Sequence, residues 1–243
     1  MIDFYDTLDN EETKSRVEVD LSLIDEAPDA ERPWLLWIFF KISDPFSTEF
    51  IRFRDDLAST LFEQLEALYA GCIIKDGWCE FYFYASTSKK FENITSDVMA
   101  RHGSYPYERG SSKDAKWEMY LERLYPEPID MIKMQNRDTI AALLEAGDDL
   151  NRAREVEHYC FFQTPTALKR FSESIISEGF DVKEEMNNDE SEYAYGVTLI
   201  KDESITPEQV EETTSTLYEA TLIEHGIYEG WSTVLAEDEH GAE

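Results

Sequence analysis

Two threonine–proline pairs, Thr164-Pro165 and Thr206-Pro207, predict where two helices begin in the second half of the chain. In each pair the threonine hydroxyl suits an N-cap and the proline suits the first helical turn. Gly179 is typical of the end of the first helix. Four strand-like runs surround the two helices: EVEHYCFF (155–162), FDVKEEM (180–186), EYAYGVTLIK (192–201) and YEGWSTVL (228–235). This pattern predicts the order β-α-β-β-α-β.

The first half predicts a similar order after one leading strand. Residues 1–15 are polar and expected to be frayed, and Arg16 to Leu23 alternates as a half-buried strand does. The apolar run 34–42 suits a central strand. The remaining predicted elements are a helix from about Phe50 that stops at Gly71, a hairpin around Asp76-Gly77, a helix near 89–101 and a last strand at Trp117 to Leu124.

The predicted fold class is therefore α+β, with two ferredoxin-like (βαββαβ) domains, the first carrying an extra N-terminal strand. Residues 1–126 form the first domain, 127–146 a helical connector and 147–243 the second domain. A length of 243 residues suits two domains. Folds of this class host many functions, so the fold alone indicates none.

Acidity is the most unusual property of the composition, since 53 Asp and Glu stand against 22 Lys and Arg, a formal charge of −31. Residues 1–150 carry a net −15 and residues 151–243 a net −16, so the charge belongs to the whole chain. Such a field repels phosphate and disfavours direct binding of nucleic acid. Two interpretations stay open: the acids serve solubility, or they attract a basic partner.

Signs of catalysis are missing from the sequence. Cys72, Cys79 and Cys160 lie in apolar strand-like runs without CxxC spacing, which favours buried free thiols in a reducing compartment. His158 is expected in a core or at a strand edge, and no phosphate-binding or metal-binding motif is present. We therefore predict no catalytic residue, cofactor or metal, and hence not an enzyme. With no visible signal peptide or membrane span, a cytoplasmic location is expected.

The strongest candidate for a binding surface is the acidic end of the chain, because Lys and Arg are absent between Asp202 and Glu243. Acids in a first helical turn also stabilise the helix dipole, which accounts for Glu208 and Glu211 in part. A basic, arginine-rich segment of another protein could dock on such a surface. The predicted partner-binding residues are Glu208, Glu211, Glu212, Glu237, Asp238 and Glu239.

Several stretches of the second half resemble the family of the regulator of ribonuclease E activity B. They are GDDLNRAREVEHYCFF (147–162), EGFDV (178–182), TPEQVEE (206–212) and HGIYEGWSTVLAE (225–237). The first half resembles a family of uncharacterised bacterial domains often found beside that regulator. This resemblance is carried by Pro33-Trp34-Leu35, by Phe81 to Tyr84, and by Trp117, Tyr120 and the Leu124-Tyr125-Pro126 ending.

The first resemblance implies a non-catalytic protein that binds an endoribonuclease and restrains RNA decay, with a basic segment of ribonuclease E as the partner. The second resemblance brings no known activity. Two other classes stay open: an enzyme with a site between the domains, and an acidic structural or assembly module.

Overall fold

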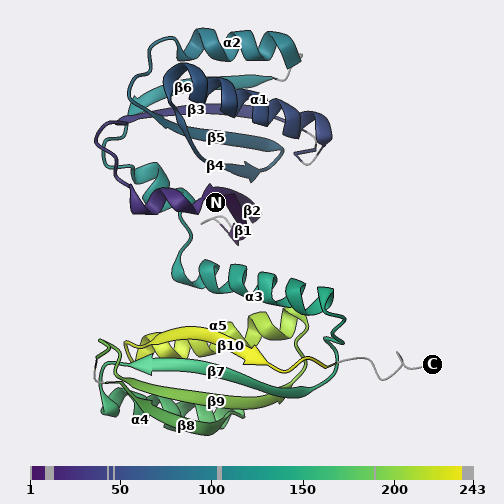
Figure 1. Ribbon diagram of the computed structural model, residues 1–243, viewed down its shortest axis with the longest axis vertical. Coiled ribbons are helices and arrows are strands. Elements are labelled where there is room, and N and C mark those ends of the chain that lie inside the picture. Colours follow the sequence, from purple (N-terminus) through teal and green to yellow (C-terminus); the bar gives the residue numbers. More distant parts are fainter. Residues whose placement is uncertain are drawn as a thin grey trace, which may run out of the picture. The chain divides into compact units, whose positions relative to one another are not determined.

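The computed structural model describes residues 2–8, 14–42, 44–45, 47–102, 106–188 and 190–236. The chain divides into two compact units, Met1–Asp130 and Met131–Glu243. Each unit contains one antiparallel sheet with helices, as Figure 1 shows, which confirms the predicted α+β class.

The first unit holds a six-stranded sheet in the order β1-β2-β4-β5-β3-β6. Its strands are β1 (Ile2–Leu8), β2 (Lys14–Asp20), β3 (Trp34–Lys41), β4 (Leu68–Lys75), β5 (Trp78–Ala85) and β6 (Tyr107–Lys113). Its helical elements are η1 (Leu21–Asp25), α1 (Thr48–Leu65), α2 (Phe91–His102) and the π-helical η2 (Tyr120–Leu124). The two α-helices share a core with β3, β4 and β5 that includes Phe40, Phe53 and Phe81.

The predicted hairpin is confirmed in β4 and β5. Asp76 and Gly77 both have positive φ, at 51° and 76°, as a two-residue turn of the I′ type requires. Lys75 faces Trp78 across the turn. The turn residues therefore set the register of the two strands at the centre of the sheet.

The predicted last strand at Trp117 to Leu124 is wrong, because this segment is helical and ends in η2. Apolar residues at 117, 120, 121 and 124 follow helical spacing, and the Asp114 carboxylate accepts hydrogen bonds from the backbone N–H groups of Glu118 and Met119. The Trp117 ring stacks on Tyr84 with 4.0 Å between centroids. The last strand is instead β6, which is polar and pairs with β3.

The start of the first unit also differs from the prediction. Two leading strands precede β3 instead of one, since residues 2–8 form β1, which pairs with β2. The helix expected to stop at Gly71 ends at Leu65, and Glu66 takes the left-handed conformation at its C-cap. Gly71 lies inside β4, where a Cβ would stand 2.2 Å from the backbone carbonyl oxygen of Glu18. This glycine therefore permits the close approach of β2 and β4.

The second unit holds a four-stranded sheet in the order β10-β7-β9-β8. Its strands are β7 (Arg154–Phe162), β8 (Asp181–Asn187), β9 (Tyr195–Glu203) and β10 (Ile227–Thr233). Its helical elements are α3 (Pro128–Glu145, which begins at the end of the first unit), α4 (Pro165–Ile175), η3 (Ile176–Glu178) and α5 (Pro207–Ile223). Among the described residues of this unit, β8 and β10 are the edge strands.

The helix signals read from the sequence of this unit are confirmed. The Thr164 hydroxyl accepts a hydrogen bond from the Ala167 N–H, and the Thr206 hydroxyl accepts one from the Gln209 N–H. Gly179 has a φ of 87° at the C-cap of η3. Capping thus fixes where α4 and α5 begin, and their apolar sides cover the sheet.

Helix α3 packs within the second unit. Ile132 lies in the core formed by α4, α5 and the sheet, and Ile140 packs with Val156, Ile205 and Val210. The stretch expected as a connector therefore contributes apolar side chains to this core. Among the helices of the described residues, none combines the length and the apolar character needed to cross a membrane.

Candidate acidic binding surface

Helix α5 carries a stripe of carboxylates along its exposed side. Glu208, Glu212 and Glu219 are four and seven residues apart, so they lie on one face of the helix. All three are exposed, whereas Val210, Thr213 and Leu217 on the other face are buried. We call Glu208, Glu212 and Glu219 the α5 stripe. The inward packing of the helix leaves this stripe facing solvent.

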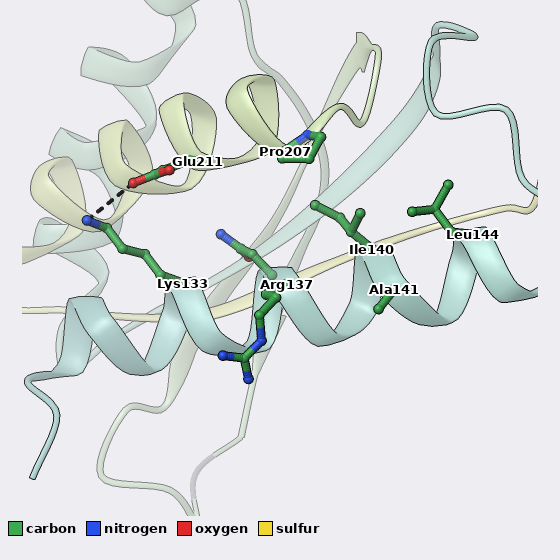
Figure 2. A pocket seen from close by; sticks show the side chains of 8 residues that line it. Lys133, Arg137, Ile140, Ala141, Leu144, Pro207 and Glu211 are labelled. Atoms are coloured by element: carbon green, nitrogen blue, oxygen red, sulfur yellow. Dashed lines mark ion pairs between the residues drawn. The ribbon is translucent and has the colours of Figure 1, made fainter. Parts of the chain in front are cut away.

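A groove runs between α3 and α5, with a volume of about 330 Å³. Figure 2 shows Ile140, Ala141 and Leu144 on α3 and Pro207 on α5 as its apolar lining. Lys133 forms an ion pair with Glu211 at 3.3 Å on one side of the groove. The charged residues that line the groove are Lys133, Arg137 and Glu211. Glu208 and Glu212 of the α5 stripe directly follow the lining residues Pro207 and Glu211 in sequence, so apolar side chains of a segment could enter the groove while its basic side chains meet the stripe.

Asn136 holds α3 in place beside α5. Its amide nitrogen donates to the Thr214 hydroxyl at 2.8 Å, and its amide oxygen accepts from the Trp231 indole N–H at 2.8 Å. Asn136 and Thr214 are both buried. One side chain thus joins α3, α5 and β10, and it fixes the width of the groove.

A buried ion pair ties the end of the described chain to the start of β7. The Arg154 guanidinium donates to both Asp148 carboxylate oxygens, at 2.7 and 2.6 Å. Asp148 also accepts the Ala236 N–H at 2.9 Å, and Arg154 donates to the Val234 carbonyl at 3.1 Å. The Arg154 hydrogen bond holds the pKa of the Asp148 carboxyl below its usual range. These residues lie within the stretch that resembles the regulator family, and their role is structural.

A second buried cluster joins His158, Glu203 and Tyr228. The Nδ1 atom of His158 lies 2.9 Å from the Tyr228 hydroxyl, and the Thr213 hydroxyl donates to Glu203 at 2.8 Å. His158 and Glu203 are only 1% and 8% exposed, so a substrate in solvent does not reach them. Burial also raises the pKa of the Tyr228 hydroxyl. The cluster therefore lacks the access that catalysis requires.

The three cysteines are free and buried, as the sequence predicts. Burial raises the pKa of the Cys160 thiol to about 12, and a hydrogen bond with Cys72 together with burial raises that of Cys79. Cys79 and Cys160 are therefore unsuited to a thiolate nucleophile. Within the described ranges, no group of three or more His, Cys, Asp or Glu side chains could hold a metal ion.

The structure places the predicted partner-binding residues in two groups. Glu208, Glu211 and Glu212 are exposed on α5. Glu237, Asp238 and Glu239 lie outside the described residues. Sequence reasoning missed α3 as the second wall of the groove, although the apolar residues from Ile129 to Leu144 gave a usable helical period.

Each half of the chain is similar to one known family. Residues 133–233 match the model of the family Regulator of ribonuclease activity B. Residues 9–125 match a family of unknown function, DUF695. None of the curated proteins matches the chain. Both resemblances predicted from the sequence are confirmed.

One solved structure similar to the chain is that of an unknown protein from Galdieria sulphuraria, with 8% identity. The similarity covers 84% of this chain and 99% of that one, with a TM-score of 0.24. A score this low carries no argument about the fold. The similarity to known families thus rests on the two family models, DUF695 over residues 9–125 and the regulator of ribonuclease activity B over residues 133–233.

Proposed function

We propose that this protein is a non-catalytic regulator that binds an endoribonuclease of the ribonuclease E kind and so slows RNA decay. The match of residues 133–233 to a family of ribonuclease regulators is the observation that carries the proposal. The buried state of the titratable clusters supports a role without catalysis. A protein with this role acts in the cytoplasm, where RNA decay takes place.

We place the binding surface at the α5 stripe and the adjoining groove, including Glu211. Glu237, Asp238 and Glu239 lie outside the described residues and stay predicted partner-binding residues. A basic segment of the enzyme fits this surface because its charges meet carboxylates and its apolar side chains meet Ile140 and Leu144. Direct contact with RNA is disfavoured by the net charge of −31.

Each unit presents its last four strands and two α-helices in the order β-α-β-β-α-β. The strand orders β4-β5-β3-β6 and β8-β9-β7-β10, with all pairs antiparallel, support a ferredoxin-like topology for both units. We retain residues 1–126 and 147–243 as the proposed domains. The packing of Ile132 and Ile140 supports a functional link between residues 127–146 and the second domain.

The test is a titration of the full chain against the basic, non-catalytic region of the ribonuclease from its own host, at 50 and 300 mM salt (on the order of the range over which screening acts). Binding should weaken as salt rises, and RNA cleavage by the enzyme should slow when the complex forms. Absence of binding at the lower salt concentration would refute the proposal.

The location of the surface is tested by charge reversal. Glu208→Lys with Glu212→Lys should weaken binding by about 1–2 kcal/mol, or roughly five- to thirtyfold, because two attractive contacts become repulsive. The matched control is Glu63→Lys with Glu92→Lys, which changes the net charge equally on exposed positions of the first unit. Equal effects of the two double variants would show that only the overall charge matters, and unchanged binding in both would leave the acids a role in solubility.

A further inference from the structure

Strand β8 ends the sheet of the second unit, and beside it lies a pocket of about 670 Å³. The pocket is bounded by α4, by the start of η3 and by β8. Leu168, Ile176, Val182 and Met186 supply its apolar lining. Ile176 and Val182 are 56% and 39% exposed, so the pocket presents apolar surface to solvent beside the edge strand.

One of the residues that line this pocket, Ser172, has a buried hydroxyl. The Ser172 side chain is 9% exposed, and its hydroxyl has no hydrogen-bond partner. A buried hydroxyl without a partner is unfavourable, so such groups usually bond to a ligand or to water. The polar side chains that line the pocket and are exposed are Lys169, Glu173, Glu185 and Asn187, so polar groups surround its apolar part.

The outer edge of β8 presents backbone groups that no described strand pairs with. An edge of this kind can accept an added strand from another chain. Alternate side chains of an added strand would point to the two faces of the sheet. One set would enter the pocket beside α4, and the other would lie on the opposite face.

The acidic side chains of β8 favour a basic strand at its outer edge. Asp181, Glu184 and Glu185 are exposed on β8, and the one basic residue of the strand, Lys183, already pairs with Glu155 and Glu157 at 2.6 and 2.7 Å. A second copy of β8 would bring the same carboxylates together, so pairing of two copies is disfavoured. A basic strand would instead neutralise them.

We propose that β8 and the adjoining pocket form a docking site for an extended segment of another protein in which basic and apolar residues alternate. The segment adds to the sheet at β8, its apolar side chains enter the pocket, and its basic side chains face Asp181 and Glu184. This inference goes beyond the proposed function because it assigns a second surface, away from the α3–α5 groove. Its test uses no ribonuclease, so the two proposals can fail independently.

The test uses the full chain and a labelled nine-residue peptide of alternating lysine and valine, with binding followed by fluorescence anisotropy at low salt. Saturable binding is expected. Two control peptides should bind at least tenfold more weakly: one with N-methyl groups along the pairing edge and one with glutamate in place of lysine. Equal binding of the N-methylated peptide would exclude strand addition, and equal binding of the glutamate peptide would exclude the charge argument.

Protein variants locate the site. Ile176→Ser and Val182→Ser remove exposed apolar groups and should each weaken peptide binding roughly tenfold, since buried aliphatic side chains contribute about that factor. Ile223→Ser is the matched control, because Ile223 is 76% exposed on α5 and does not line the pocket. Loss of binding in Ile223→Ser alone would place the peptide elsewhere and overturn the inference. A dimer of the free chain that Val182→Ser dissociates would also overturn it.

Discussion

Replacing Asp148 by asparagine should destabilise the second unit strongly. The side chains of Arg154 and Asp148 are 6% and 0% exposed, and two short hydrogen bonds join them. Asparagine keeps the shape of the carboxylate and removes its charge, so the guanidinium stays buried without a counter-ion. Breaking a buried pair in this way costs about 3–5 kcal/mol.

The hydrogen bonds between Arg154 and Asp148 give a second, independent value for the free-energy cost of this substitution. Asparagine retains one acceptor oxygen, so one of the two hydrogen bonds from Arg154 is lost and the other loses its negative partner. Each charge-assisted bond contributes about 1.5–3 kcal/mol, so this loss supplies a large part of the cost of leaving the charge unpaired. A domain of this size has a free energy of unfolding of about 5–15 kcal/mol. The substitution should therefore remove between about a fifth and all of the stability of the second unit.

The assay must follow the two units separately, because a two-domain chain need not unfold in one step. Trp231 is the one tryptophan of the second unit, and the other four lie in the first. Urea unfolding of 5-fluorotryptophan-labelled chain, followed by fluorine NMR, therefore reports each unit. With a slope of about 2 kcal/mol per molar urea, the Trp231 midpoint should fall by about 2 M, while the other four signals keep theirs.

Asp138→Asn is the matched control. Its pair with Arg137 is exposed, so its loss should change the free energy of unfolding by less than about 1 kcal/mol. A Trp231 midpoint in Asp148→Asn that stays within about 0.5 M of the parent, with an unchanged slope, would refute the reasoning about the buried pair.

The same pair predicts a dependence on pH. The Arg154 hydrogen bond lowers the pKa of Asp148 in the folded chain, below the value of about 3.9 for an unfolded aspartate. The stability contributed by ionised Asp148 is therefore present above about pH 4 and is lost as the pH falls through the folded pKa. The difference in midpoint between the parent and Asp148→Asn should shrink below pH 4, and a difference that grows there would contradict this assignment.

Three further substitutions test other parts of the structure. Asn136→Ala should cost about 2–3 kcal/mol and shift the Trp231 emission, because the indole N–H loses its acceptor; an unchanged spectrum and midpoint would contradict the bridge between α3 and β10. Gly71→Ala should destabilise the first unit by several kcal/mol in urea, since its Cβ would meet the Glu18 carbonyl, and a neutral result would show that β2 can move away. Ser172→Ala should raise the thermal midpoint of the second unit slightly, by up to about 1 kcal/mol in free energy, and a clear loss would mean that the hydroxyl has a partner.

The second unit was largely predictable because its signals are local. Thr164 and Thr206 cap helices through hydrogen bonds to residues three positions ahead, and Gly179 supplies a positive φ at a helix end. Such signals act within a few residues of sequence, so they can be read without knowledge of the fold. The Asp76-Gly77 turn in the first unit was readable for the same reason.

The wrong predictions in the first unit concern segments whose structure depends on contacts distant in sequence. Strand β6 contains the polar run Glu108 to Lys113, and its state depends on pairing with β3, which no local pattern reports. The segment at 117–124 did carry a helical spacing, but its run of large apolar residues favoured a strand. The Asp114 carboxylate favours the helical turn, because it accepts hydrogen bonds from two backbone N–H groups at the start of that turn.

The candidate site was predictable only where exposure follows from helix periodicity. The positions of Glu208 and Glu212 on the outer face of α5 follow from the inward spacing of Val210, Thr213 and Leu217. The α3–α5 groove could not be predicted from the sequence, because it depends on the long-range hydrogen bonds made by Asn136. The pocket beside β8 likewise requires the strand order, which places this strand at the edge.

The ion pairs of the second unit engage most of its basic side chains and leave an excess of carboxylates. Its basic side chains are largely engaged with carboxylates of the same unit, in pairs that involve Lys133, Arg137, Arg154, Lys169, Arg170, Lys183 and Lys201. The α5 stripe lies in the stretch from Asp202 to Glu243, which has no Lys or Arg, and the one basic residue of β8, Lys183, already pairs with Glu155 and Glu157. At Glu211 a basic segment would compete with Lys133, and its binding to the carboxylates of both surfaces would reduce the repulsion among them. Both surfaces are therefore suited to a partner that supplies basic side chains.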